Sequence, residues 1–346
     1  MKINDIIPDD KIFIVAELSA NHNGSLDTAI ETIRAARRCG ADAIKLQTYT
    51  ADTMTLDVNH KDFVISNGSI WDGDNLYKLY QQAHTPWEWH ETLFNVAKEE
   101  GLICFSTPFD FTSVDFLESL NNPIYKVASF EITDLPLIKY IAKKGKPIIL
   151  STGIATIDEI DEAINTIRAT GNNQITLLKC TSSYPAPVEE ANLVMIQEYK
   201  KKYNVITGLS DHTLGTTIPV VATALGAKII EKHFILDKSI GGPDASFSLD
   251  EKEFKEMVEA VRIAEKGVGE VSFNLTEKQK SGRFFSRSLI VSRDVKKGDE
   301  LSSENIRSLR PGIGISPKYY TSVIGRKFKE DYSIGTPLNH DMIANE

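Results

Sequence analysis

Two histidines end separate apolar runs and could together bind a metal ion. His212 and His233 each follow a short apolar segment and stand beside the acidic residues Asp211 and Glu231. Imidazole is the commonest protein ligand for metal ions. Because the chain has no short metal-binding motif, the spacing leaves two interpretations open: a divalent-metal site, or two hydrogen-bonded core histidines. The acidic neighbours either orient the two rings or form salt bridges elsewhere.

Three lysines interrupt apolar runs in the same way. Lys45, Lys126 and Lys179 occupy segments that are otherwise suited to burial, and a buried lysine needs a partner. One such lysine could extend to solvent at the rim. Three together suit a substrate that carries both a phosphate and a carboxylate. Lys179 has a second interpretation, because a desolvated lysine forms the Schiff base of a class I aldolase.

Hydroxyl and carboxyl side chains follow several of the same runs. Singly, each hydroxyl is typical of a helix cap or a turn, but together they predict a pocket for an anion. Glu17 and Glu131 are candidates for a general base or for partners of substrate hydroxyls, and pairing with the lysines is the alternative. The hydroxyl-bearing residues are Ser106, Thr107, Ser129, Ser151, Thr152, Thr181, Ser182 and Ser183.

Eight short apolar runs position these side chains. Helical patterns lie between them, with Ser25 and Thr156 as candidate N-caps and Pro86 at a first helical position. Alternation of strand and helix predicts an α/β protein with a (β/α)8 TIM barrel, in which every strand delivers its carboxyl end to one face. An open doubly wound sheet is the alternative, weakened because no GxGxxG motif follows the first run. The apolar runs are 12–19, 43–49, 102–107, 124–129, 147–152, 175–182, 205–212 and 228–234, and helical patterns include 25–39, 85–100, 156–171 and 250–265.

The chain is longer than a barrel requires. It has 346 residues, whereas a TIM barrel takes roughly 250. We expect a catalytic barrel over 1–270, a polar linker over 271–286 and a compact, mostly β module over 287–346. Residues 50–84 are too many for an ordinary barrel connection, and a long structured loop at the active face is typical of a lid or a subunit contact.

Composition and charge exclude several classes of function. The formal net charge of −9 disfavours binding to nucleic acid. No apolar run approaches the ~20 residues that span a bilayer, and the N-terminal sequence lacks the apolar core of a signal peptide. The three cysteines show no CxxC spacing, which is typical of a reducing compartment. We therefore expect a cytoplasmic protein with neither nucleic acid nor a membrane as partner.

Taken as a set, the motifs resemble those of the sialic acid synthases, enzymes that condense phosphoenolpyruvate with an N-acylated amino sugar. The resemblance covers nearly the whole chain, and the combination is specific although each motif alone is weak. The matching segments are 16–24 (AELSANHNG), 43–47 (AIKLQ), 105–109 (FSTPF), 125–131 (YKVASFE), 150–153 (LSTG), 184–185 (YP), 208–212 (GLSDH), 231–234 (EKHF) and 242–244 (GPD).

The C-terminal module resembles the small antifreeze-like domain (SAF, β-clip) that follows these barrels. The similarity lies in 287–289 (RSL), 305–307 (NIR) and 310–312 (RPG). In the family this domain swaps across a homodimer and brings an arginine into the partner's site. Arg310 fits that position. The resemblance therefore implies a homodimer with exchanged C-terminal domains.

Within the family, the chain most resembles the pseudaminic acid branch, whose sugar is a diacetamido-trideoxy hexose (6-deoxy-AltdiNAc). The similarity lies in 19–22, 70–90 and 241–249. Ser182 and Ala245 stand where the N-acetylneuraminate branch tends to carry asparagine and histidine. N-acetylneuraminate and legionaminate synthesis are the alternatives within the family. A sugar-binding or scaffold protein is the alternative from another class.

The resemblance also implies a role for each candidate residue. His212 and His233 would hold a divalent metal, with manganese first and magnesium or cobalt as alternatives, that activates the sugar aldehyde. Glu131 would handle the proton of the water or the sugar, and Glu17 would share in the catalytic step. The resemblance assigns phosphoenolpyruvate to Lys45, Thr107, Lys126, Ser129, Ser151, Ser182 and Ser210, and the sugar to Glu17, Tyr184, Asp244 and Arg310.

Overall fold

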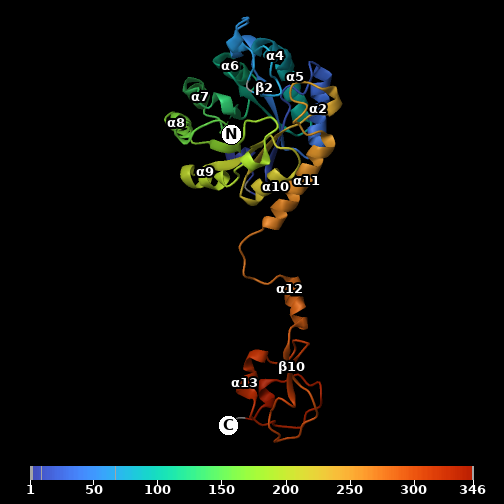
Figure 1. Ribbon diagram of the computed structural model, residues 1–346. Helices are drawn as coiled ribbons and strands as arrows, with labels where there is room; N and C mark the ends of the chain where they lie inside the picture. Colours follow the sequence, from blue (N-terminus) through green and yellow to red (C-terminus); the bar gives the residue numbers. More distant parts are fainter. Residues whose placement is uncertain (1–2, 9, 67, 345–346) are drawn as a thin grey trace. The chain divides into compact units, whose positions relative to one another are not determined.

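The computed structural model describes residues 3–8, 10–66 and 68–344 and divides the chain into two compact units (Figure 1). The first unit runs to Gly269 and the second begins at Glu270. Each has a hydrophobic core of its own. No helix among the described residues is long and apolar enough to cross a membrane.

The first unit is a closed barrel of eight parallel strands that pair in chain order. β1 closes the barrel by pairing with both β2 and β8, so that Glu17 lies in register with Lys45 on one side and with His233 on the other. The closed order confirms the predicted (β/α)8 barrel and excludes the open doubly wound sheet. The strands are β1 (Phe13–Glu17), β2 (Ala43–Thr48), β3 (Ile103–Pro108), β4 (Tyr125–Val127), β5 (Ile148–Ser151), β6 (Ile175–Cys180), β7 (Ile206–Asp211) and β8 (Ile229–His233).

Helices surround the barrel (Figure 1). The predicted caps at Ser25 and Thr156 are confirmed, since each hydroxyl accepts a hydrogen bond from a backbone N–H of the following turn. The helix expected over 85–100 begins later: after Pro86 the chain forms a 3-10 turn, and the α-helix starts at His90. The helices of this ring are α2 (Leu26–Arg38), α5 (His90–Glu99), α6 (Phe111–Ser119), α7 (Leu135–Ala142), α8 (Ile157–Arg168), α9 (Met195–Tyr203), α10 (Thr217–Ala224) and α11 (Glu251–Val268).

Alternation along each strand decides which side chains enter the barrel. Phe13 and Val15 pack in the interior cluster, together with Ile6 and Ile7 at the end of the short helix α1 (Ile3–Ile6). The intervening residues of β1 pack outward against the helices. Side chains in a strand alternate between its two faces, so Glu17, two residues after Val15, enters the barrel as well. The interior is therefore apolar at one end and polar at the other.

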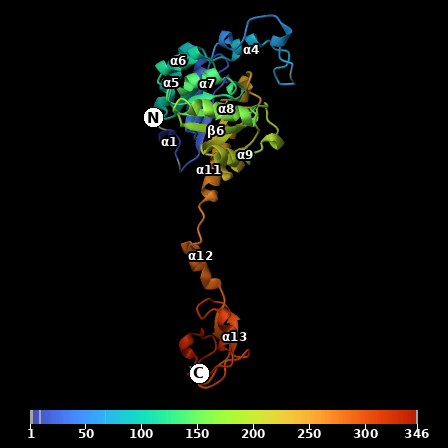
Figure 2. The ribbon, with the colours of Figure 1, turned by 90° about the vertical axis from the view of Figure 1, so that its left-hand side faces the viewer.

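The long segment between β2 and α5 is structured. It contains α3 (Ala51–Met54), a 3-10 turn (Lys61–Phe63) and α4 (Leu76–Ala83). The Asn75 side chain caps α4 by accepting hydrogen bonds from two backbone N–H groups. Figure 2 shows the chain before α4 extending beyond the ring of helices. This segment is long enough to cover one end of the barrel.

The second unit combines short strands, bridges and turns. β9 (Ser288–Val291) and β10 (Ile306–Leu309) form an antiparallel pair, and Leu289, Val291 and Ile306 belong to its core. The stretch expected to be a polar linker contains the short helix α12 (Glu277–Gly282), and α13 (Tyr320–Val323) lies later in the unit. The remaining 3-10 turns among the described residues of both units are Trp87–Trp89, Ser129–Glu131, Val188–Glu190, Lys238–Ile240, Arg283–Phe285, Pro317–Tyr319 and His340–Met342.

Candidate active site

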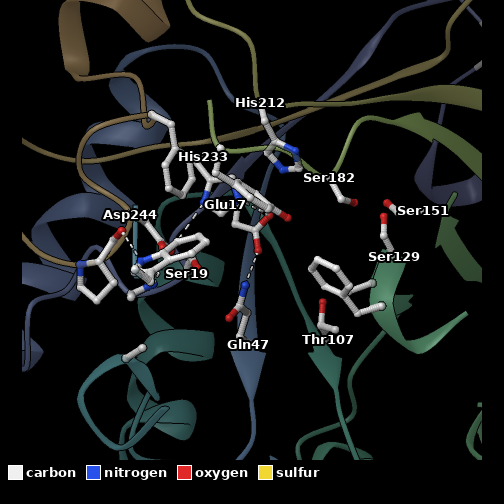
Figure 3. A pocket seen from close by; sticks show the side chains of 18 of the residues that line it. Glu17, Ser19, Gln47, Thr107, Ser129, Ser151, Ser182, His212, His233 and Asp244 are labelled. Carbon is white, nitrogen blue, oxygen red and sulfur yellow. Dashed lines mark hydrogen bonds and ion pairs between the residues drawn. The ribbon is translucent and has the colours of Figure 1, made fainter. Parts of the chain in front are cut away.

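A pocket of about 760 Å³ lies at the carboxyl ends of the barrel strands. The barrel residues to which the resemblance assigned a role all line it, and Figure 3 shows several of them facing the same space from different strands. Ser106, Thr152, Thr181 and Lys179, which the sequence also offered as candidates, do not line it. Arg310, the remaining predicted residue, belongs to the second unit. The lining residues predicted from the sequence are Glu17, Lys45, Thr107, Lys126, Ser129, Glu131, Ser151, Ser182, Tyr184, Ser210, His212, His233 and Asp244.

A buried cluster of charges forms the floor of the pocket. Lys45 Nζ lies 2.8 Å from Glu17 Oε2 and 2.6 Å from Glu231 Oε1. Lys126 Nζ lies 3.8 Å from the same Glu231 oxygen. Burial alone would lower the pKa of Lys45, but Glu17 and Glu231 outweigh it and raise that pKa. Burial also lowers the pKa of Lys126, and here the attraction of Glu231 is too weak to offset it. Both lysines line the pocket, where they suit an anionic ligand, and Glu17 and Glu231 balance the charge of Lys45.

Several buried polar atoms of the pocket have no hydrogen-bond partner among the described residues. The hydroxyls of Thr107 and Ser151, Oε2 of Glu131 and Nδ1 of His233 all have this property. An unpaired buried polar atom costs about 1–3 kcal/mol, and a native structure retains such atoms where a ligand or a water completes them. The unpaired atoms face one pocket from four different strand ends. The arrangement therefore fits a polar ligand with several acceptors and donors.

Hydroxyl groups and a backbone N–H converge at the ends of β4, β5 and β6. The N–H of Gly153 donates to Ser129 Oγ at 3.0 Å. A Cβ at Gly153 would lie 2.1 Å from Ser182 Oγ and 2.8 Å from Ser129 Oγ, so a side chain at this position would fill the space. Figure 3 shows Ser129, Ser151 and Ser182 on the same side of the pocket. Such a group of small donors near Lys126 suits a phosphate.

The two histidines lie side by side, with ring centroids 5.3 Å apart. Nδ1 of His212 is 2.9 Å from the carbonyl oxygen of Thr181, which as a donor leaves Nε2 free to bind a cation. His233 lies 3.6 Å from Glu17 through Nε2 and 3.8 Å from Asp244 through Nδ1. Burial lowers the pKa of His233 and favours its neutral, metal-binding form. Burial also acts to lower the pKa of His212, but Cys180 outweighs it and raises that pKa.

The donor set therefore fits a divalent cation. It offers two imidazoles, one of which has an unpaired ring nitrogen, and the carboxylate of Glu17 3.6 Å from His233. Among the described residues, no three histidine, cysteine or acidic side chains form a ready-made ligand group. Such a site would keep positions for substrate or water, as catalytic sites do.

The alternation of side chains along each strand decides which of the remaining candidate residues face the pocket. Lys179 donates to its neighbour's carbonyl at Cys180 and lies on the opposite face of β6 from that cysteine, which lines the pocket. Asp211 binds Lys232 on the outer side of β7 and β8. Glu231, two residues before His233, points inward and bridges the two pocket lysines. The Schiff-base interpretation of Lys179 is therefore not supported by its position.

Other residues that line the pocket were not predicted from the sequence. Gln47 donates to Glu17 Oε1 at 2.8 Å, and its position two residues after Lys45 could have placed it on the same face. Trp71 and Phe247 come from loops, where no periodic signal marks their direction. Tyr184, which the resemblance assigned to the sugar, lies with its ring 4.3 Å from that of His212.

Comparison with known proteins decides the family. Residues 32–272 match the model of the NeuB family, and residues 286–344 match that of the SAF domain. The chain belongs to the NeuB family of sialic acid synthases. The resemblance predicted from its motifs is thereby confirmed, as is the succession of a TIM barrel and an SAF domain.

Individual members of the NeuB family match over nearly the full length of the chain. A pseudaminic acid synthase of Campylobacter jejuni is 48% identical over 338 residues, which are 98% of each chain. One of Helicobacter pylori is 49% identical and covers 95% of this chain and 97% of its own. The crystal structure of N-acetylneuraminic acid synthetase from Leptospira borgpetersenii, in complex with citrate, matches with a TM-score of 0.70 at 30% identity, covering 79% of this chain and 90% of its own.

Proposed function

We propose that the chain is a pseudaminic acid synthase. It condenses phosphoenolpyruvate with an open-chain diacetamido-trideoxy hexose (6-deoxy-AltdiNAc) and releases a nonulosonic acid and phosphate. The observation that carries this proposal is the 48% identity to a pseudaminic acid synthase over 98% of both chains. The pocket supports it, because one side offers lysines and hydroxyls and the other offers two histidines and carboxylates.

Phosphoenolpyruvate occupies the side of the pocket formed by β2 to β6, together with Ser210 of β7. Its phosphate meets Lys126 and the hydroxyls of Ser129, Ser151 and Ser210, while its carboxylate meets Lys45 and Thr107. Ser182, beside Ser129, assists either ligand. The unpaired hydroxyls of Thr107 and Ser151 support this assignment, since an anion supplies the acceptors that they lack. Lys45 exchanges part of its contact with Glu17 and Glu231 for the substrate carboxylate.

The sugar occupies the side formed by β1, β7 and β8. A divalent cation bound by His212 and His233 would polarise the aldehyde carbonyl as a Lewis acid. Glu17 and Asp244 accept hydrogen bonds from the sugar hydroxyl and amide groups. The ring of Tyr184 packs against the sugar beside these two carboxylates. Asp244 also accepts a hydrogen bond from the backbone N–H of Ala20 at 3.3 Å, which fixes its direction.

Glu131 is positioned for the proton transfer. Burial raises the pKa of Glu131 to about 7, and a base is most effective when its pKa lies near the working pH. The enol carbon of phosphoenolpyruvate forms a bond to the aldehyde carbon, whose oxygen takes up a proton and becomes a hydroxyl, while the carbon that bears the phosphate becomes electron-poor. Water adds there and gives one proton to Glu131, which replaces the proton taken up by the aldehyde oxygen. The bond between this carbon and the phosphate oxygen then breaks, the second proton of the water leaves with the phosphate, and this carbon becomes the ketone of the product.

The finer features of the proposal concern metal, assembly and location. We propose manganese as the metal, with magnesium or cobalt as alternatives, because ring nitrogens and carboxylate oxygens suit all three. We propose a homodimer in which Arg310 of one protomer contacts the sugar in the partner's pocket. The match of residues 286–344 to an SAF domain supports this assembly. The three cysteines are free and buried, which supports a cytoplasmic, reducing location.

The experiment that tests the function measures phosphate release from phosphoenolpyruvate. Three sugars are compared in parallel: the diacetamido-trideoxy hexose, its legionaminate-type isomer and N-acetylmannosamine, each with manganese and with EDTA. We expect release with the first sugar, little with the others, and none with EDTA. Preference for another sugar would replace the named substrate and keep the reaction. Activity in EDTA, together with borohydride trapping at Lys179, would favour the Schiff-base alternative.

A further inference from the structure

Aromatic rings enclose the sugar side of the pocket. The ring of Trp71 lies 5.6 Å from that of Tyr184 and 6.2 Å from that of Phe247, and the latter two lie 5.0 Å apart. Phe247 is in turn 5.0 Å from His233, and Tyr184 is 4.3 Å from His212. The three rings therefore form a continuous wall that begins at the histidine pair and ends at Trp71.

Trp71 joins two segments that are distant in the sequence. Its indole Nε1–H donates to the carbonyl oxygen of Pro243 at 3.1 Å. Pro243 precedes Asp244, which accepts from the backbone N–H of Ala20. The hydrogen bond thus connects the segment between β2 and α5 to the loop after β8 at the rim of the pocket. A single side chain supplies both the connection and one face of the wall.

The segment that carries Trp71 presents only uncharged side chains to the pocket. Ile65, Ile70, Leu76 and Leu79 line the cavity together with Trp71, and Ile70 is 49% exposed. The charged lining groups all come from the barrel strands and from the loops after β4 and β8. We call Ile65, Ile70, Trp71, Leu76 and Leu79 together the apolar lid. A half-exposed apolar surface that faces a ligand pocket is stabilised when an apolar group covers it.

We propose that the apolar lid and the wall of Trp71, Tyr184 and Phe247 bind the methyl groups of the sugar and make the enzyme selective for a sugar that carries several of them. This inference rests on the proposed function, since it concerns the second substrate of that reaction. Phosphoenolpyruvate carries a phosphate, a carboxylate and no methyl group, so it has nothing to place against such a surface. A diacetamido-trideoxy hexose carries two acetyl methyls and the methyl of its deoxygenated carbon.

The chemistry of the wall explains the direction of selectivity. One methyl or methylene group in an apolar pocket is worth roughly 10- to 200-fold in kcat/KM. A hydroxyl in place of a methyl or acetamido group would have to give up its hydrogen bonds to water against the lid, where the lining side chains offer few in return. N-acetylmannosamine, with one acetyl group and a hydroxyl at each of the other two positions, is therefore disfavoured twice.

The test compares kcat/KM for two sugars in variants of one residue. We expect Trp71→Ala to lower kcat/KM for the diacetamido sugar about 10-fold and to leave that for N-acetylmannosamine within about twofold. The KM for phosphoenolpyruvate stays within about twofold of wild type, because the lid does not contact that substrate. Trp71→Phe keeps an apolar ring and loses the hydrogen bond to Pro243. This variant therefore distinguishes the contribution of the aromatic wall from that of the hydrogen bond at the rim.

Tyr77→Phe is the matched control. Tyr77 lies on α4 beside the lining residues, and its hydroxyl donates to Asp52 outside the pocket. We expect wild-type kinetics with both sugars. Equal losses for both sugars in Trp71→Ala, or a raised KM for phosphoenolpyruvate, would overturn the inference while the wild type still turns over. Absence of phosphate release from the wild-type enzyme with every sugar would instead contradict the proposed function on which the inference rests.

Discussion

Removing Lys45 tests whether the buried charge cluster holds the pocket together. Lys45 lies between Glu17 at 2.8 Å and Glu231 at 2.6 Å, and all three side chains are at most 5% exposed. Methionine keeps the length of the lysine but leaves two buried carboxylates without their shared cation. Breaking a buried pair in this way costs about 3–5 kcal/mol. We expect Lys45→Met to lower the free energy of unfolding at pH 7 by this amount.

The pH dependence of stability gives this prediction a sign. Burial alone would raise the pKa of Glu17, but Lys45 and His233 outweigh it and hold that pKa well below its usual range. In the wild type, Glu17 therefore contributes stability that is full above pH ~4.3 and is lost as the pH falls through the lowered folded value. In Lys45→Met burial prevails, and the folded state binds a proton more readily than the unfolded state. The variant should gain more stability than the wild type between pH 7 and pH 5.5, since the raised pKa of Glu131 gives a gain that both proteins share.

Tryptophan fluorescence during urea unfolding provides the assay. The three tryptophans, Trp71, Trp87 and Trp89, all belong to the first unit, so the signal reports on the barrel. The double variant Lys45→Met/Glu231→Gln removes one of the facing carboxylates and should recover part of the lost stability without recovering activity. Equal unfolding free energies for Lys45→Met and wild type at pH 7, or a loss on going to pH 5.5, would refute the reasoning.

Three further predictions concern the roles proposed for Glu131, the histidines and Arg310. The kcat/KM of the wild type should rise with pH through about 7 as Glu131 ionises, and Glu131→Gln should lower the rate and remove that rise; an unchanged profile would exclude Glu131 as the base. His212→Asn and His233→Asn should each abolish phosphate release while keeping the free energy of unfolding, measured in urea, within about 1 kcal/mol of the wild-type value. An active variant would remove the metal assignment. Arg310→Ala should be inactive alone, yet co-expression with His233→Asn should restore about a quarter of wild-type activity, since a mixed dimer has one intact site; no restoration would mean that Arg310 acts within its own protomer or not at all.

The barrel could be predicted because its signals are local. Capping residues such as Ser25 and Thr156 mark helix starts through contacts within a few residues. The polar residues that end the apolar runs identify the strand ends, and in a parallel barrel these ends share one face. The start of α5 at His90 was missed because Pro86 is compatible with either a first helical turn or an extended entry.

Which side of a strand faces the pocket could not be predicted. Strands of a parallel barrel are buried on both faces, so apolar and polar residues do not alternate along them. Lys45 and Lys179 both occupy apolar runs, yet the first lines the pocket and the second does not. Glu231 likewise resembled Asp211 in sequence, although only Glu231 enters the barrel.

The lid was also beyond local reasoning, for a different physical reason. The long segment was recognised as a functional loop from its length alone. The hydrogen bond between Trp71 and Pro243 joins residues 172 positions apart in the chain, and no periodic pattern in a loop indicates such a partner. Side chains in loops are therefore the part of the site where a structure adds most.

The oxygen between phosphorus and the enol carbon provides the most direct test of the proposed reaction. Phosphoenolpyruvate labelled with ¹⁸O at this bridging position is incubated with the enzyme, the diacetamido hexose and manganese. Mass spectrometry then measures the ¹⁸O content of each product. We predict that the label appears in inorganic phosphate and that the nonulosonic acid carries none, because water supplies its new oxygen. Label retained in the nonulosonic acid would contradict the addition of water assisted by Glu131 and the breaking of the carbon–oxygen bond.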